Sequence, residues 1–517
     1  MEKQGIMFNY DCDNFIYTRR EIIDTVDTAY LEAFIDQYKG TQVTDFLFCV
    51  NALLSAYPSK VLTSYADRYH VTHERGQDVD YTNSCCYSAH VLWEVKKLDM
   101  YQIWIDRCRQ NGIRPWLSFR MNDAHCMMEP PHYLVPPEKY NHFDDHTCIR
   151  HRQQIGYFDR CYDYSLEEIR SRMLRYIEEA ITRYDVYGIE LDFQRELYCF
   201  RPGHEDSDRA VMTAFIRQIK DLADRVAGQI GHPIQIAARC HQNPVVCREM
   251  GFDVVEWAKQ GYINMYIVAP RWETTDTDMP IALWKQILAS YGVSVAGGLE
   301  ILTKSHKNTP HVSNSVSSAL GAAAGILSQG ADQLYLFNYF DFADQMMVGD
   351  RRTCNGEESL SVAEGMYRFL CHAGTLETVQ ACPRKNLVTY ADIAPFWRHI
   401  DFQLPCIIND PKLPREYRCL PSYLRIVTGR IDKHQTADLV LGIQEAFSPE
   451  CCDVFINCEK LEFVSEVPPT APVLTKSKLY AFRLPDSVKH FDIKTIELLI
   501  QDAAKTFTID YADISIR

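Results

Sequence analysis

Several common signals are missing from this chain of 517 residues. No apolar stretch at its start is long enough for a signal peptide, and no later stretch is long enough to span a membrane. Basic patches are missing too, and the net charge of −15 argues against a nucleic acid or an anionic membrane as a partner. We therefore expect a soluble protein with a small-molecule partner.

The 19 cysteines also lack a recognisable arrangement. No Cys-x-x-Cys pair occurs, and the adjacent pairs Cys85–Cys86 and Cys451–Cys452 do not have the spacing of metal ligands. Scattered thiols in a chain without a signal peptide favour the reducing cytoplasm. No Gly-x-Gly-x-x-Gly follows the first expected strand, which argues against a dinucleotide site. We predict no metal and no cofactor.

What the chain does contain is a repeated strand-helix unit. The expected strands are 6–10, 43–51, 113–119, 187–193, 234–239, 263–269, 293–299 and 333–339, and helical patterns follow at 20–38, 98–110, 165–184, 208–228, 252–260, 281–291, 315–328 and 360–372. Eight such units predict an α/β fold, a (β/α)8 TIM barrel, rather than an open doubly wound sheet.

The pattern changes near residue 404. Short strands separated by Pro, Gly and Asp are expected at 418–428, 437–443, 452–456, 461–464, 479–483 and 495–499. They predict a C-terminal antiparallel β-sandwich. We expect the barrel at 1–375, a linking segment at 376–404 and the sandwich at 405–517. The sandwich could bind glycan, mediate dimerisation or cap the barrel.

The fourth expected strand carries the strongest chemical signal. In the run YGIELDFQRE, residues 187, 189, 191 and 193 are apolar, whereas Glu190 and Asp192 share the other face. Burying two unpaired carboxylates costs several kcal/mol. An ordinary core strand does not carry them on its inner face, so a specific site must require them there.

The other expected strands also bring polar groups to their carboxyl ends, where barrel enzymes form active sites. At inward positions or just beyond lie Asn9, Asp11, Asn51, Arg120, Asn122, Asp123, His125, Arg239, His241, Arg271, Trp272, Glu300, Asn338 and Asp341. Any one of them could belong to an interior salt bridge. A purely structural barrel would not gather charge at one end, so the set predicts a pocket.

Long connections are expected at the same end, at about 52–91 and 123–163. The second contains His125 and four further histidines, but their spacings match no metal-ligand motif. Aromatic, Asn and Arg side chains together suit a polyhydroxylated ligand better. Trp272 and Tyr10 are candidates for stacking on a sugar ring.

Glycosidic bonds are cleaved by two carboxyl groups, one protonating the leaving oxygen and the other attacking or activating water. Asp192 and Glu300, on strands four and seven, are the leading pair. We expect Asp11, Asn51, Arg120, Asn122, His125, Glu190, Arg239, Trp272 and Asn338 to bind substrate. Glu190, one pleat deeper than Asp192, would pair with Arg120 or Arg239 and separate the pKa values of acid and base.

The strand-four sequence Gly-Ile-Glu-Leu-Asp-Phe-x-Arg, within eight βα units followed by a β domain, resembles the TIM-barrel glycoside hydrolases, and among them poorly characterised glycosyl-hydrolase-like barrel proteins. In the clan A enzymes the acid/base ends strand four and a Glu nucleophile ends strand seven. The resemblance implies Asp192 (or Glu196) as the acid and Glu300 as the nucleophile. The Asn-Glu pair of those enzymes is absent at strand four.

Two other groups offer different assignments. Chitinase-like barrels place a Glu two residues after the Asp, where this chain has Gln194. The α-amylase and α-galactosidase clans use a strand-four Asp as nucleophile, so Asp192 would attack and the acid would come from another strand. The assignment of roles stays open between these models.

The leading hypothesis is a retaining glycoside hydrolase of a small oligosaccharide or glycoside, and the expected cytoplasmic location favours an exo-acting enzyme. A homo-oligomer is possible. A second hypothesis is a carbohydrate-binding barrel without catalysis, with its carboxylates more than about 10 Å apart. A third is a barrel isomerase or aldolase. That chemistry calls for a Schiff-base Lys or a metal cluster at a strand end, and no expected strand ends in Lys.

Overall fold

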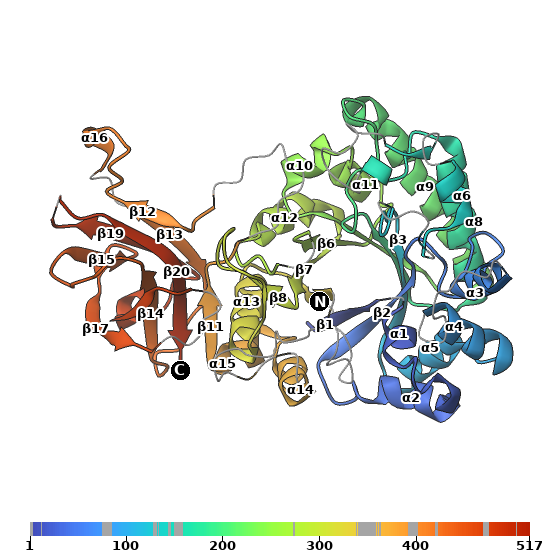
Figure 1. The fold of residues 1–517 in the computed structure, drawn as a ribbon, viewed down its shortest axis with the longest axis horizontal. Helices are drawn as coiled ribbons and strands as arrows, with labels where there is room; N and C mark the ends of the chain where they lie inside the picture. Colours follow the sequence, from blue (N-terminus) through green and yellow to red (C-terminus); the bar gives the residue numbers. More distant parts are fainter. Residues whose placement is uncertain are drawn as a thin grey trace.

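A computed structural model describes residues 4–11, 13–74, 85–127, 132, 134–142, 146–148, 159–271, 274–337, 339, 358, 360, 363–390, 402–418, 422–468, 475–502 and 504–517. Its N-terminal part is a closed barrel of eight parallel strands in the order β1-β10-β7-β6-β5-β4-β3-β2 (Figure 1). The strands are β1 Ile6–Tyr10, β2 Val43–Asn51, β3 Arg114–Arg120, β4 Gly188–Asp192, β5 Gln235–His241, β6 Met265–Ala269, β7 Ser294–Glu300 and β10 Gln333–Phe337. The predicted TIM barrel is confirmed.

Helices between the strands cover the outside of the barrel (Figure 1). The longer ones are α2 Thr28–Asp36, α3 Tyr65–Glu74, α5 Met100–Gln110, α8 Glu167–Arg183, α9 Glu205–Ile230, α12 Ile281–Leu288, α13 Val316–Ser328 and α14 Ala363–His372. Shorter ones are α1 Asn14–Thr18, α4 Cys85–His90, a π-helical turn Val91–Val95, α6 Pro137–Asn141, α10 Pro244–Glu249, α11 Val254–Lys259, α15 Leu376–Ala381 and α16 Arg415–Arg418. In the described residues no helix is both long and apolar enough to cross a membrane.

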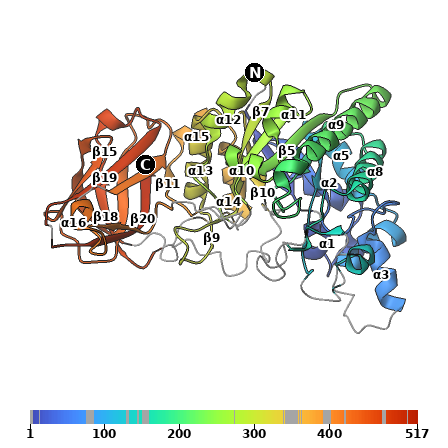
Figure 2. The same cartoon turned by 90° about the horizontal axis from the view of Figure 1, so that it is seen from above.

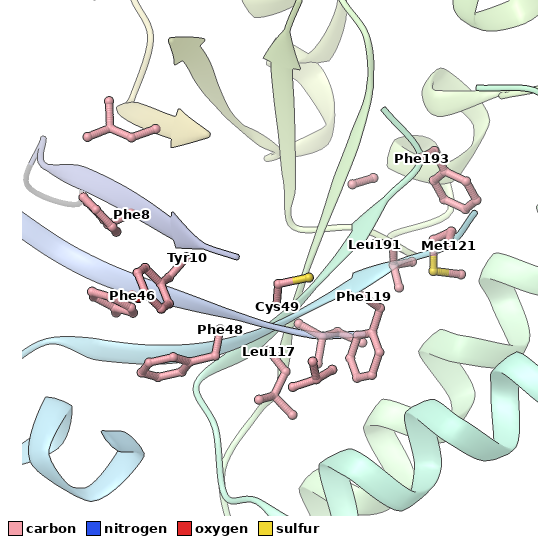
Figure 3. Close-up of a cluster of buried hydrophobic side chains, with 14 of the residues drawn as sticks. Phe8, Tyr10, Phe46, Phe48, Cys49, Leu117, Phe119, Met121, Leu191 and Phe193 are labelled. Atoms are coloured by element: carbon pink, nitrogen blue, oxygen red, sulfur yellow. The ribbon is translucent and has the colours of Figure 1, made fainter. Parts of the chain in front are cut away.

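The alternating strand pattern separates an apolar core between strands and helices from a smaller apolar cluster inside the barrel. Phe8, Phe46, Leu117, Leu191 and their neighbours point outward and pack with the helices in the main core (Figure 3). Tyr10 belongs to this layer: it is 2% exposed and packs against the rings of Phe34, Phe46 and Trp104. Because its side chain lies outside the barrel, the prediction of a sugar-stacking role for Tyr10 is wrong.

Inside the barrel the amino-terminal end is closed by a buried ion pair. Asp45 accepts two 2.7 Å hydrogen bonds from the Arg114 guanidinium and further bonds from the side chains of Trp116 and Gln333. Every acceptor position of this carboxylate is therefore used in holding β2, β3 and β10 together. Buried charge lies at both ends of the barrel, not only at the end where we expected the pocket.

The C-terminal part is a sandwich of two sheets, as predicted. One has the order β11-β20-β14-β18-β17, with β12 also pairing with β20; the other is β13-β19-β15-β16. Their bounds are β11 Arg384–Leu387, β12 Cys406–Ile408, β13 Ser422–Val427, β14 Ala437–Ile443, β15 Cys452–Ile456, β16 Glu459–Lys460, β17 Glu462–Val467, β18 Lys478–Arg483, β19 Ile493–Ile500 and β20 Phe507–Ile516. A hairpin, β8 Leu302–Thr303 and β9 Val312–Ser313, follows β7.

The sandwich lies beside the barrel, next to α13 and α15 (Figures 1 and 2). Within the stretch expected to link the two parts, β11 pairs with β20 and packs on α13. The side chain of Asn386 donates to the carbonyl oxygens of Gly321 on α13 and Val427 on β13, at 2.7 and 3.0 Å. The domain limits at 375 and 404 stay predictions.

Candidate active site

The inner face of β4 meets the barrel axis as expected. Ile189 and Leu191 lie in the outer core, whereas Glu190 and Asp192 are 0% and 1% exposed and contact polar groups inside the barrel. From Ile189 to Phe193 the alternation therefore has the predicted effect on both faces, whereas Tyr187 packs against Trp116 inside the barrel and not in the outer core. The two carboxylates, however, have different partners.

Asp192 is held from two directions. The Nε and Nη2 atoms of Arg239 on β5 each donate to it at 3.0 Å, and the backbone N–H groups of Gln194 and Arg195 donate at 2.9 and 3.1 Å. These four bonds occupy the carboxylate and shape the turn after β4. Asp192 is thus a positioned ion-pair partner in this structure, and its predicted catalytic role stays a prediction.

Glu190 lies one pleat below and is less completely paired. Its Oε2 accepts from Asn9 at 2.7 Å, while its Oε1 lies 3.9 Å from Nε of Arg239. Burial raises the pKa of Glu190 to about 7, and nearby Asp192 adds to the rise while Arg239 opposes it. The predicted pairing of Glu190 with Arg239 is present, although it is longer than a hydrogen bond.

Arg239 crosses the barrel interior. Its guanidinium carbon lies 3.7 Å from the ring centroid of Phe337 on β10. A fully buried cation is tolerated here because two carboxylates and an aromatic face surround it. Arg239, predicted to bind substrate, is 0% exposed and is committed to the barrel interior.

At the rim, acidic and basic side chains form a connected chain of contacts that runs from Asp11 to Arg195. Arg120 donates to Asp11 at 2.6 Å and to Asp123 at 3.3 Å, and Asp123 contacts Nδ1 of His125 at 2.6 Å. Nε2 of His125 in turn meets the Arg195 guanidinium. Burial pushes the pKa of Asp123 upward, but the charges of His125, Arg120 and Arg195 together hold it well below its usual range. The predicted residues Asp11, Arg120 and His125 are therefore brought together.

This rim network is most exposed at His125 and less so at Asp11, whose side chain is 19% exposed. The His125 side chain is 39% exposed, whereas Asp123 beneath it is 1% exposed. Close by, burial raises the pKa of Asp13 to about 6, with the neighbouring Asp11 adding to the rise. A polar ligand arriving at the mouth would meet His125 first.

Asn51 and Asn122, both predicted to bind substrate, form hydrogen bonds with backbone groups near the strand ends in this structure. Nδ2 of Asn51 donates to the backbone of Arg120 at 2.9 Å. The amide of Asn122 donates to Tyr162 O and Tyr198 O and accepts from Tyr162 N. These bonds tie the long loop after β3 to the segment after β4. A contact of either residue with substrate stays a prediction.

Glu196 has the environment that Asp192 lacks. It lies four residues beyond Asp192, is 0% exposed, and neither carboxylate oxygen has a hydrogen-bond partner in the described structure. The nearest cation is Arg271, whose Nη2 lies 3.6 Å from Oε2. Burial raises the pKa of Glu196 to about 7, although Arg271 and Arg195 pull it down. A buried carboxyl that holds its proton near neutral pH is suited to general acid catalysis.

Glu300 ends β7 and is 1% exposed. Its backbone oxygen accepts from Thr275 at 2.6 Å and from Asn314 at 3.0 Å, which fixes the end of the strand against the loop after β6. Arg271, the neighbour of Glu196, begins that same loop. Strands β6 and β7 pair directly, with Val268 opposite Gly297. The Glu196 side chain contacts Arg271, and the Glu300 backbone oxygen accepts from Thr275, so both residues meet the loop after β6.

Gly298 and Ala269 keep the barrel narrow beside Glu300. A Cβ on Gly298 would lie 2.7 Å from the Ala269 Cβ, so β6 and β7 approach closely at this level. At Gly298 the neighbouring strand β6 fills the space beside β7. Trp272 and Asn338, two further predicted binding residues, lie outside the described residues.

The sequence offers Glu196 only as an alternative to Asp192 for the acid, and it gives no role to Arg195. The signal for Arg195 was its position in the turn after β4, facing the loop that carries His125. Among the described residues, no group of three or more His, Cys, Asp or Glu side chains is arranged to hold a metal ion.

Comparisons with known proteins add only the fold. No protein-family model and no curated protein matches the chain. Similar solved structures include a glycoside hydrolase family 18 N-acetylglucosaminidase from Paenibacillus barengoltzii (11% identity, TM-score 0.31, 58% of this chain and 70% of that one). Others are catalytic domain 2 of a group II chitinase from Ostrinia furnacalis (10%, 0.38, 73% and 97%) and a β-galactosidase from the psychrophilic Marinomonas ef1 (8%, 0.41, 73% and 59%). These neighbours are glycoside hydrolases, and likeness at this level says nothing about the activity of this chain.

Proposed function

We propose that this barrel is a retaining, exo-acting glycoside hydrolase of a small oligosaccharide or glycoside, with Glu196 as the general acid and Glu300 as the nucleophile. The observation that carries the proposal is Glu196: a fully buried carboxyl at the barrel mouth, without a hydrogen-bond partner in the described structure and with a pKa raised to about 7. By contrast, Asp45 has its acceptors filled, and Asp192 accepts four hydrogen bonds, three of them on Oδ1.

The acid step follows from this environment. At neutral pH a substantial fraction of Glu196 carries a proton, which it gives to the glycosidic oxygen as the bond to the anomeric carbon breaks. Arg271, at 3.6 Å, then stabilises the carboxylate that remains. In the second half of the reaction the same carboxylate takes a proton from the attacking water, which restores the acid.

Glu300 supplies the second carboxyl group. It attacks the anomeric carbon and forms a glycosyl-enzyme, which water then hydrolyses with retention of configuration. Such a mechanism needs the two carboxyl groups about 5 Å apart. Support comes from the loop after β6, where Arg271 contacts Glu196 and Thr275 donates to the backbone oxygen of Glu300. The rim network of Arg120, Asp123 and His125 would bind the sugar hydroxyl groups.

One observation favours a second candidate, a carbohydrate-binding barrel without catalysis. Asp192, the strand-end acid that several glycosidase groups use, is occupied by Arg239 and two backbone N–H groups. A barrel that had lost catalysis could keep such an ion pair for its stability alone.

A screen of aryl glycosides, with product stereochemistry followed by NMR, identifies the substrate and the outcome at the anomeric carbon. Glu196→Gln and Glu300→Gln should each reduce kcat/KM by at least about a thousandfold. The roles then separate: azide should restore turnover to Glu300→Ala as a glycosyl azide. Glu196→Gln should retain activity on substrates whose leaving group needs no protonation.

The matched control is Glu178→Gln, at a carboxylate on α8 that pairs with Arg225 on the surface. Its kinetics should equal those of the wild type. Binding of sugars without hydrolysis of any of them would establish the non-catalytic candidate. Full activity of both Glu196→Gln and Glu300→Gln on every cleaved substrate would overturn the assignment.

A further inference from the structure

A cavity of about 730 Å³ lies between the helices of the barrel and the C-terminal sheet. Its lining comes from α13 and α14 on one side and from β11, β14, β17, β18 and β20 on the other. Figure 1 shows α13 and β11 side by side at the junction of the two parts. Volumes of about 300–1,000 Å³ are typical of small-molecule sites.

The cavity wall is mostly apolar. Leu320 on α13 faces it from the barrel, and Val440, Val464 and Ala481 face it from the sheet. Such a surface favours an apolar ligand body, because burying it releases water from both partners.

The polar groups of the lining are predominantly cationic. It contains five Lys or Arg residues and two acids. Both acids are already paired: Asp438 accepts from Arg483 and Arg517, and Glu358 contacts Arg368 at 2.5 Å. Both acids of the lining therefore have arginine partners other than Arg384.

Arg384 is the key residue. It is 1% exposed and lines the cavity, and its Nε atom has no hydrogen-bond partner in the described structure. Its other nitrogens donate to three backbone carbonyls, those of Gln380, Cys382 and Arg430, and not to a carboxylate. Burial lowers the pKa of Arg384 to about 10.

Carbonyl oxygens satisfy hydrogen bonds but do not neutralise a charge. The Gln380 and Cys382 carbonyls lie at the C-terminus of α15, whose partial negative charge compensates only part of a buried guanidinium. A second buried cation, Lys494, lies close enough to repel Arg384. An anion in the cavity would offset the uncompensated charge of Arg384 and weaken its repulsion with Lys494.

We propose that this cavity binds an organic anion with an apolar body, with its carboxylate or phosphate on Arg384 and its chain against the β-sheet wall. The N-terminus of α13, where Val316 and Ser317 line the cavity, adds a second positive pole on the facing side. Such a ligand would contact both parts of the protein at once and stabilise their junction. The proposal does not depend on the reaction at the barrel mouth.

The test is calorimetric titration of the intact protein with decanoate, compared with 1-decanol and with acetate. Decanoate should bind at least about tenfold more tightly than decanol, and acetate should not bind measurably at about 1 mM. Arg384→Met should weaken decanoate about tenfold and leave decanol unchanged. The surface variant Arg217→Met is its control.

Ser317→Phe, which narrows the cavity without touching its buried charge, should weaken both long-chain ligands, whereas Ser207→Phe on exposed α9 should not. This pair and the comparison of decanoate with decanol keep the test decisive should Arg384→Met not fold. Equal affinity for decanoate and decanol, or no decanoate binding at about 1 mM, would overturn the proposal.

Discussion

Two acids four residues apart show how environment divides chemical roles at the scale of single residues. Asp192 receives two bonds from Arg239 and two from the backbone, so its charge is compensated and fixed in place. Glu196 receives none in the described structure, and burial raises its pKa to about 7. The ionised form of Glu196 is therefore costly, which is the property expected of an acid catalyst.

That cost predicts a pH-dependent stability difference for Glu196→Gln. In the unfolded chain a Glu has a pKa of about 4.3, below its value of about 7 in the folded protein. The folded state therefore binds the proton more tightly, and the free energy of unfolding falls as pH rises from about 4.3 to about 7. Gln cannot ionise and avoids this loss. Relative to wild type, the variant should gain on the order of 3 kcal/mol between pH 4.5 and pH 8.

Urea unfolding at the two pH values measures this difference. Glu190, whose pKa is also raised, titrates in both proteins and cancels. Glu178→Gln should show the wild-type dependence. Parallel pH profiles for Glu196→Gln and wild type would mean that Glu196 ionises without cost, and the proposed acid would lose its main support.

For Asp192 we predict a loss of stability on removal of the charge, because this carboxylate is paired with a buried arginine. Asp192→Asn leaves Arg239 buried without its main counter-ion and should lower the free energy of unfolding by about 3–5 kcal/mol. Adding Arg239→Met removes the stranded charge, so the double variant should be more stable than Asp192→Asn alone. A double-mutant cycle by urea unfolding measures the coupling. Wild-type stability of Asp192→Asn would contradict a structural role.

At the scale of elements, α13 depends on its glycines. A Cβ on Gly321 would lie 1.9 Å from the carbonyl oxygen of Lys385 on β11, so helix and strand are in backbone contact. Gly321→Ala must separate them and should cost about 1–3 kcal/mol or more. Gly228→Ala on α9 is the matched control: nothing lies within 4 Å, and alanine should add about 0.5–1 kcal/mol through helix propensity. Thermal unfolding compares the two, and equal shifts would contradict the close contact.

The strands that build the barrel were predictable because each alternates or is continuously apolar between turn residues. The expected ranges 6–10 and 43–51 coincide with β1 and β2, and the remaining barrel strands shift by one or two residues.

The last strand, β20, was missed. Its pairing with β14 shifts register between Gly442 and Ile443, so a bulge interrupts the alternation in FTIDYADISI. The contacts of Asp192 were beyond prediction, since they depend on how β5 and the turn after β4 meet.

At the scale of the whole molecule, the barrel and the sandwich share one helix. Eleven of the thirteen residues of α13 are buried, on all sides of the helix, which requires a partner on its outer side as well as the barrel on its inner side. Strand β11 and Asn386 provide that partner. We therefore expect the intact protein to unfold in a single calorimetric transition. Residues 1–375 alone should melt at lower temperature and bind a hydrophobic dye through the uncovered face of α13. An unchanged melting temperature without dye binding would show that the sandwich is dispensable for the barrel.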